Sequence, residues 1–282
     1  FYSLQGEGKF VGVPSVFLRT FGCNLRCQNF GLNKDRKKSR YNPEVEQLIK
    51  DGVHETTRRF EDLPIIHTGC DTYASIYPEF KHFNMLRDVE DVVDHLVSLI
   101  PDGKWTQDNG QDIHLILTGG EPLLAWQRLY PDIFEHEKMK DLKNVTFETN
   151  STQPLHEEFK DYLNSNDRIK WTFSCSPKLS VSGESWESAI KPSVVADYAS
   201  VSNSDLYLKF VVADNTDIDE AGKAVAEYRA AGVECPVYLM PLGGRSEEYN
   251  LNIQEVANIC MAKGWRFTPR LHISLFGNAW GT

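Results

Sequence analysis

The stretch Val16-Phe17-Leu18-Arg19-Thr20-Phe21-Gly22-Cys23-Asn24-Leu25-Arg26-Cys27 joins an apolar run to a pair of cysteines. The apolar part predicts a β-strand that ends near Gly22. Cys23 and Cys27 follow on the loop, four positions apart, so their sulfurs can converge on one point. Converging thiolates hold zinc or iron–sulfur clusters in proteins. The alternative is a pair of buried apolar thiols, but a place at a strand end beside polar residues favours a metal site.

The composition indicates a globular protein without a membrane span. The 282 residues are 41% hydrophobic, which is enough for one large core. No apolar run approaches the roughly 18 residues of a transmembrane helix, and we see no signal peptide, so we expect a cytoplasmic protein. The net charge of −10 argues against a broad nucleic-acid-binding surface. One basic run, residues 34–40, is expected to be a solvated loop.

Short apolar runs alternate with helical or irregular segments along the chain. The runs predict six strands, at 15–20, 113–117, 145–150, 169–174, 206–212 and 236–240. Helices are expected at 43–50, 88–100, 157–163, 219–231 and 253–263. This alternation predicts an α/β protein with a parallel sheet, and six strands fall short of a closed eight-stranded barrel. We therefore expect an open, six-stranded parallel β/α barrel, with a further strand possible at 270–276.

Polar motifs follow several of these strands at the point where each strand ends. Thr118-Gly119-Gly120-Glu121-Pro122 follows the second strand, Glu148 and Asn150 end the third, and Ser176-Pro177-Lys178 follows the fourth. Chemistry in parallel α/β sheets takes place at the carboxyl ends of the strands. Each of these three motifs alone could be a simple turn. Together with the cysteine pair, which is the fourth motif on the same rim, they predict a functional site.

The cysteine pair resembles the start of the Cys-x₃-Cys-x₂-Cys motif of radical S-adenosylmethionine (SAM) enzymes. In those enzymes three cysteines hold a 4Fe–4S cluster, SAM binds the remaining iron, and a Gly-Gly-Glu-Pro string contacts SAM. Here Phe30 stands at the third position, and the next cysteine is Cys70. Two hypotheses remain open: residues 28–69 are an insertion after which Cys70 returns to the cluster, or the cluster is lost and the fold is a relic.

Cys70-Asp71-Thr72 and other motifs resemble the 7-carboxy-7-deazaguanine synthase family of radical SAM enzymes. The chain shares Leu4-Gln5-Gly6-Glu7-Gly8, Arg19, Ser176-Pro177-Lys178 and the ending from Leu271 to Asn278 with that family, in the same order. The resemblance covers nearly the whole chain. It implies a single radical SAM domain, residues 1–282, with an insertion at about 28–69 and a C-terminal extension at about 265–282.

The resemblance also implies the residues of the site. Cys23, Cys27 and Cys70 would hold the 4Fe–4S cluster, and Thr72 would bind Mg²⁺. SAM would be contacted by Gly69, Asp71, Gly119, Gly120, Glu121, Glu148, Ser176, Pro177 and Lys178. The substrate would be bound by Leu4, Gln5, Gly6, Glu7, Arg19, Thr118, His272 and Thr282. Simpler alternatives are a salt bridge from Arg19 to Glu148, a turn at Asp71 and Thr72, and a structural role for His272.

The implied activity is that of a radical SAM lyase. It converts 6-carboxy-5,6,7,8-tetrahydropterin to 7-carboxy-7-deazaguanine with loss of ammonia, on the route to queuosine. The implied partners are the pterin, an electron donor such as flavodoxin or ferredoxin, and a second copy of the chain in a homodimer. The alternatives are a glycyl-radical activase, which would not need Gln5, Arg19 or Thr72, and a non-catalytic interaction protein on a relic scaffold.

Overall fold

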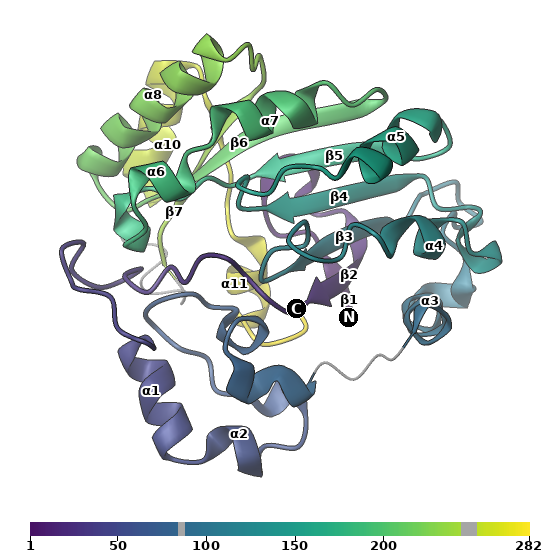
Figure 1. Cartoon of the computed structure of the whole chain (residues 1–282), viewed down its shortest axis with the longest axis horizontal. Helices are drawn as coiled ribbons and strands as arrows, with labels where there is room; N and C mark the ends of the chain where they lie inside the picture. Colours follow the sequence, from purple (N-terminus) through teal and green to yellow (C-terminus); the bar gives the residue numbers. More distant parts are fainter. Residues whose placement is uncertain (84–87, 244–252) are drawn as a thin grey trace.

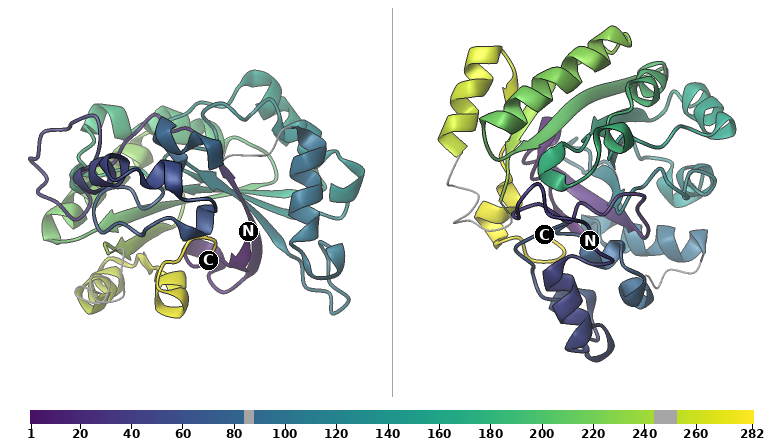
Figure 2. Two further views of the ribbon diagram at one scale, coloured as in Figure 1. Left: turned by 90° about the horizontal axis from the view of Figure 1, so that it is seen from below. Right: turned by 60° about the vertical axis from the view of Figure 1, so that its left-hand side comes forward.

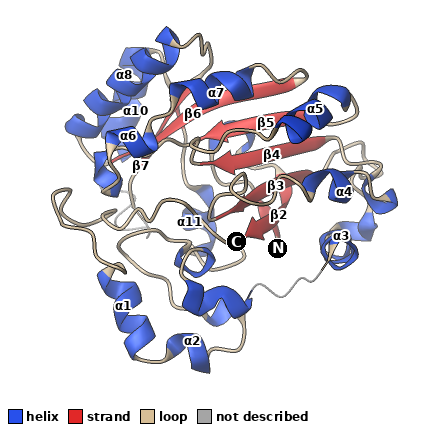
Figure 3. Ribbon diagram, in the orientation of Figure 1, coloured by secondary structure: helices blue, strands red, loops and turns tan. Residues whose placement is uncertain are grey.

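The computed structural model describes residues 1–83, 88–243 and 253–282. They form one eight-stranded sheet whose strands lie side by side in chain order (Figures 1 and 3). The strands are β1 (Tyr2–Leu4), β2 (Pro14–Thr20), β3 (His114–Gly119), β4 (Asn144–Thr149), β5 (Lys170–Cys175), β6 (Ser204–Val212), β7 (Val237–Pro241) and β8 (Arg266–Phe267). Only β1 pairs antiparallel; every later neighbour is parallel. The expected open parallel barrel is therefore confirmed, with two short edge strands added.

Helices cover the outer side of the sheet, and a separate group lies across its other side (Figures 1 and 2). The outer helices are α3 (Val89–Ser98), α4 (Tyr130–Phe134), α5 (Glu157–Ser165), α6 (Trp186–Ala189), α7 (Pro192–Ala199), α8 (Asn215–Ala230) and α10 (Ile253–Lys263). The other group is α1 (Pro43–Lys50), α2 (Val53–Thr56) and α11 (Leu271–Phe276). Short 3₁₀ turns span Gly8–Phe10, Phe60–Asp62, Tyr73–Ser75, Pro78–Phe83, Pro101–Gly103, Glu137–Met139 and Ser180–Ser182. Helix α8 begins before the expected 219 because Asp214 caps it, accepting a hydrogen bond from the Asp217 amide.

Alternation along the strands decides which side chains reach the functional site. Leu117, Phe147 and Phe173 point outward into the main hydrophobic core. Side chains of the opposite parity face the inside of the open barrel. Among these, Arg19 and Lys209 carry charges into that interior. The outer face thus holds the fold together, while the inner face is free to carry polar chemistry.

The strand expected at residues 270–276 is wrong, because this segment forms helix α11. Pro269 precedes it, and Gly277 ends it in the left-handed conformation that closes many helices (φ 64°). Only Ile273 is fully buried, while Leu275 and Phe276 are exposed. One buried position in six residues suits a short surface helix rather than a strand of a sheet.

The insertion and the segment that follows it share a small second hydrophobic core. Its buried members are Val45, Leu63 and Ile66 of the insertion and Tyr73, Ala74, Ile76, Tyr77 and Phe80 after it, which form a cluster separate from the main core. Helix α1 begins where Asn42 accepts hydrogen bonds from the backbone amides of Glu44 and Val45. The insertion and residues 73–80 therefore fold together as a compact unit against the barrel.

Candidate functional site

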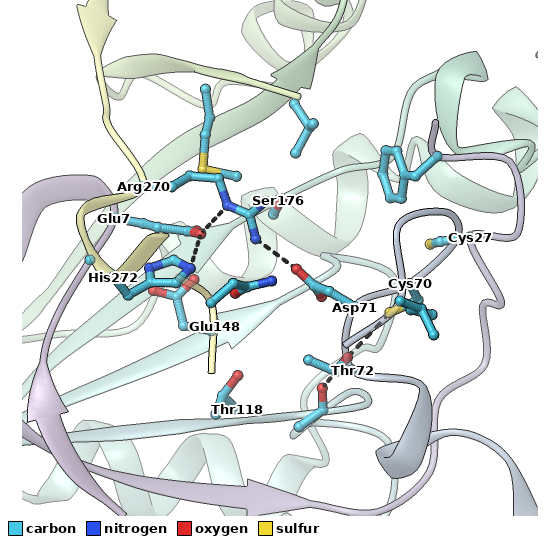
Figure 4. A pocket seen from close by; sticks show the side chains of 18 of the residues that line it. Glu7, Cys27, Cys70, Asp71, Thr72, Thr118, Glu148, Ser176, Arg270 and His272 are labelled. Carbon is cyan, nitrogen blue, oxygen red and sulfur yellow. Dashed lines mark hydrogen bonds and ion pairs between the residues drawn. The ribbon is translucent and has the colours of Figure 1, made fainter. Parts of the chain in front are cut away.

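A cavity of about 650 Å³ lies at the carboxyl ends of the strands (Figure 4). This volume falls within the range of pockets that bind small ligands and cofactors. The inner face of the sheet, the insertion and the C-terminal tail all contribute to its wall. Of the predicted site residues, the lining includes Leu4, Gln5, Gly6, Glu7, Arg19, Cys23, Cys27, Gly69, Cys70, Asp71, Thr72, Thr118, Gly119, Gly120, Glu148, Ser176, Lys178, His272 and Thr282. Glu121 and Pro177 are not among the lining residues.

Cys23, Cys27 and Cys70 line this cavity together. Burial raises the pKa of Cys23 to about 12, and it also raises the pKa values of Cys27 and Cys70. The thiols are therefore protonated in the metal-free protein and would release protons on binding iron. Among the described residues, no three metal-binding side chains are close enough to hold a single ion. Three cysteine thiolates are the kind of donor that iron–sulfur clusters take, so the residue types of this wall suit a 4Fe–4S cluster.

Hydrogen bonds at the base of the insertion bring the chain back to the cavity. The Phe30 carbonyl accepts a 2.7 Å hydrogen bond from the Gly69 amide. The side-chain amide of the buried Asn42 donates a hydrogen bond to the Gln28 carbonyl at 3.1 Å and another to the Thr68 hydroxyl at 3.2 Å. The two ends of the insertion thus lie side by side. This closed base explains how Cys70, distant in sequence, reaches the cavity that Cys23 and Cys27 line.

Glu184 holds the loop that carries the first two cysteines. Its Oε1 accepts hydrogen bonds from the backbone amides of Arg26 at 2.9 Å and Cys27 at 2.8 Å. Cys27 has a positive φ of 47°, which few residues other than glycine adopt. The basic run 34–40 is a loop whose residues are mostly exposed, as expected. Within it Lys38 pairs with Glu184 and Lys34 pairs with Asp217 of α8, and these ion pairs tie the insertion to the barrel.

We predict that Glu184→Ala loosens the cysteine loop. The substitution leaves two backbone donors without their acceptor, at a cost of about 1–3 kcal/mol for each that stays buried. The rate at which reconstituted protein loses iron to a chelator should rise about tenfold or more. Glu187→Ala is the control, because Glu187 is an exposed acid on the next helix. Equal rates of iron loss in the two variants would show that Glu184 does not hold the loop.

The Gly119-Gly120-Glu121 motif supports the cysteine loop through backbone packing. A Cβ at Gly119 would lie 2.1 Å from the Thr20 carbonyl oxygen, and one at Gly120 would lie 2.1 Å from the Gly22 oxygen. Only glycine fits at both positions. Glu121 is fully buried and turned away from the cavity, with its carboxylate accepting from the Leu123 and Asn150 amides and the Thr149 hydroxyl. Burial raises the pKa of Glu121 to about 6.

Arg19 also lines the cavity, where the charges of Asp71 and Cys70 act on it. Within the part of the chain that the structure describes, its buried Nε and Nη1 atoms have no hydrogen-bond partner. The alternative of a salt bridge to Glu148 is not realised, because Glu148 accepts from Gln5, Ser174 and Lys209 instead. Burial lowers the pKa of Arg19. An unpaired buried guanidinium is costly, and a bound carboxylate would satisfy it.

A network of charges surrounds Glu7 on the same side of the cavity (Figure 4). Lys209 donates to Glu7 at 2.7 Å and to Glu148 at 3.0 Å, and Arg270 donates to Glu7 at 3.2 Å. Burial acts to raise the pKa of Glu7, but Lys209 and Arg270 outweigh it and hold that pKa well below its usual range. Glu7 therefore presents an ionised carboxylate to the cavity at neutral pH.

Asp71, Thr72 and His272 take part in contacts of their own. Asp71 accepts from Arg270 at 2.6 Å, and the Thr72 hydroxyl lies 3.2 Å from the Cys70 sulfur. The predicted magnesium ligand Thr72 therefore lies beside Cys70. Gly6 packs directly on His272, because a Cβ at Gly6 would lie 2.2 Å from the ring Nδ1. Burial lowers the pKa of His272.

The sequence predicted no role for three residues of the site. Lys209 and Arg270 line the cavity, and so does Asn150, whose side chain donates to Cys23 at 3.7 Å and to Asn24 at 3.0 Å. A lysine within an otherwise apolar strand was the available signal for Lys209. Asn150 was noticed at its strand end but was given no role. Arg270 carried no signal, because the segment after it was expected to be a strand.

Known proteins resemble this chain over nearly its whole length. The 7-carboxy-7-deazaguanine synthase of Halobacterium salinarum is 31% identical over 298 aligned residues, which cover 99% of this chain and 89% of the relative. The synthase of Pyrobaculum aerophilum is 29% identical, with coverages of 100% and 94%.

No protein-family model matches the sequence. Among solved structures, Streptococcus suis SuiB bound to S-adenosylmethionine aligns with 91% of this chain and 51% of its own, at 10% identity and a TM-score of 0.43. That likeness is remote, and the assignment rests on the relatives that share sequence along the full chain. The chain belongs to the 7-carboxy-7-deazaguanine synthase family.

Proposed function

We propose that this protein is a radical SAM lyase that converts 6-carboxy-5,6,7,8-tetrahydropterin to 7-carboxy-7-deazaguanine and ammonia, in the biosynthesis of queuosine and related deazaguanines. The relatives are named for this product. The observation that carries the proposal is that one cavity is lined both by three cysteines and by an arginine whose buried nitrogens lack partners among the described residues. The same cavity would thus bind both the iron–sulfur cluster and the carboxylate of the substrate.

The cysteine end of the cavity would receive the cofactors. Cys23, Cys27 and Cys70 would hold the 4Fe–4S cluster, with SAM beside it. When bound, the cluster and SAM supply the radical chemistry that protein side chains lack. SAM would be contacted by Gly69, Asp71, Gly119, Gly120, Glu148, Ser176 and Lys178, which line the cavity. Glu121 would act through the loop it stabilises, and Mg²⁺ would be bound by Thr72 and the substrate.

The opposite end would bind and orient the pterin. Arg19 would pair with the substrate carboxylate in two parallel hydrogen bonds, which fix its direction. Glu7 would accept from the N–H groups of the pterin ring, and Gln5 is held in place by its hydrogen bond to Glu148. Lys209 pairs with both acids and balances their charge. Such positioning is the protein's share of catalysis when a cofactor performs the reaction.

Several further features belong to the same proposal. We infer a single catalytic domain, with its insertion and C-terminal extension, that works as a cytoplasmic homodimer and takes electrons from a flavodoxin or ferredoxin. One eight-stranded sheet, whose strands are neighbours in chain order, supports the single domain. Within the described ranges, no helix is long and apolar enough to cross a membrane.

An anaerobic turnover assay tests the proposed function. Reconstituted protein with SAM, Mg²⁺, a reductant and carboxytetrahydropterin should release 7-carboxy-7-deazaguanine and ammonia in equal amounts. Tetrahydropterin without the carboxylate is the control, and it should be neither bound nor converted because Arg19 would stay unpaired. Protein with a full cluster that neither binds nor converts the pterin would rule the proposal out and would favour a glycyl-radical activase.

A further inference from the structure

Trp280, near the C-terminus, packs against the small second hydrophobic core that the insertion shares with residues 73–80. Its ring lies 4.7 Å from the Phe60 ring and 5.4 Å from the Tyr73 ring, with the planes nearly perpendicular in both pairs. Phe83 meets Phe60 from another side at 6.2 Å. We call Phe60, Tyr73 and Phe83 the aromatic box. Edge-to-face pairs of this kind are the favoured geometry for aromatic side chains.

The residues around Trp280 form part of the cavity wall. The C-terminal tail, Asn278–Thr282, lines the cavity, and so does the returning segment of the insertion, 65–69. Two attachments hold the tail. On the barrel side, the Leu271 amide donates to the Gly6 carbonyl at 2.9 Å, and on the insertion side Trp280 enters the aromatic box.

Between these two attachments the chain passes through α11 and a tight turn. Gly277 ends α11 in the left-handed conformation, and the Ala279 amide donates to the Phe276 carbonyl at 3.3 Å. The indole Nε1 of Trp280 is buried and has no hydrogen-bond partner among the residues that the structure describes. Aromatic packing, rather than a polar contact of the indole, therefore keeps Trp280 in the insertion.

We propose that the insertion holds the C-terminal tail in place, with Phe60 and Trp280 as positioning residues for the substrate end of the cavity. We call the aromatic box and Trp280 together the latch. When the Trp280 ring packs in the aromatic box, the tail covers the cavity. When the ring leaves the box, the tail moves away and the cavity is open. The link to the substrate rests on the proposed function, whereas the latch itself does not. This gives the insertion a task beyond returning Cys70 to the cavity.

Hydrogen exchange tests the latch without any turnover. In Phe60→Ala the amides of residues 278–282 should exchange faster than in the wild-type protein, because the tail opens more often. Trp280→Ala removes the same contacts from the tail side and should give the same result with the insertion core otherwise intact. Phe276→Ala is the matched control, since that ring is exposed on the same segment, and its tail should exchange as in the wild type.

Kinetics then connect the latch to the substrate. Phe60→Ala and Trp280→Ala should raise KM for carboxytetrahydropterin about tenfold, because apparent affinity falls with the fraction of molecules whose tail is seated. Iron content should stay at the wild-type value in both variants. Unchanged tail exchange in both variants would overturn the proposal. Faster exchange in a protein whose wild type makes no deazaguanine would support the latch while ruling out the proposed function.

Discussion

Cys70→Ala should abolish assembly of the cluster. The wild-type protein, reconstituted without oxygen, should hold about four irons and about four sulfides per chain and should be brown. With Cys70 removed, only Cys23 and Cys27 remain in the cavity, and two thiolates leave two irons of a 4Fe–4S cluster without protein ligands. We therefore expect iron and sulfide well below half of the wild-type amounts, together with loss of the cluster absorbance.

Cys235→Ser provides the matched control for this experiment. Cys235 is a free thiol that does not line the cavity, so its substitution should leave the iron content unchanged. A Cys70→Ala protein that keeps a full cluster would contradict our account of the insertion, because the third ligand would then lie elsewhere. The relic hypothesis predicts a different result, in which the wild-type protein also fails to retain iron.

The sequence could predict the return of Cys70, but not how the chain achieves it. The Asp71-Thr72 sequence that follows Cys70 suggested a shared site, whereas spacing alone argued against one. The hydrogen bond between Phe30 and Gly69 and the two bonds of the Asn42 amide join positions far apart in sequence. No local pattern encodes such contacts, because they depend on the folded core of the insertion.

The strands were predictable because each is a short apolar run, and some of these runs also alternate with a period of two. In β4, for example, Val145 and Phe147 alternate with Thr146 and Glu148, and the structure buries the first pair in the main core. The same alternation misled at the C-terminus. Leu271–Phe276 has a strand-like pattern but no neighbouring strand to pair with, and the left-handed turn at Gly277 favours a helix.

Site residues were hardest to predict where their role depends on partners. Lys209 lies in an apolar strand, and its value to the site comes from Glu7 and Glu148, which approach it from other parts of the chain. Glu121 shows the opposite case, since its motif pointed to a ligand while its carboxylate is satisfied within the protein. Motifs identify which positions matter, but the direction of a side chain follows from the fold.

Arg19→Met should remove most of the affinity for the pterin. Losing one partner of a buried charge pair costs about 2–5 kcal/mol, or roughly 30- to 4,000-fold in Kd. Calorimetry with carboxytetrahydropterin and cluster-loaded protein measures this change. Arg266→Met is the control, because Arg266 contacts Tyr238 outside the cavity and should not affect binding.

The same substitution should make the substrate-free protein more stable, which separates a binding role from a structural one. In the described part of the chain two guanidinium nitrogens of Arg19 are buried without a partner, so the folded protein bears the cost of desolvating them. Methionine has a similar length and no polar atoms, and replacing buried charges with apolar groups often stabilises a protein by about 1–4 kcal/mol. Arg19→Met should therefore raise Tm without substrate while weakening binding. A lower Tm with unchanged affinity would show that Arg19 supports the fold and does not receive the carboxylate.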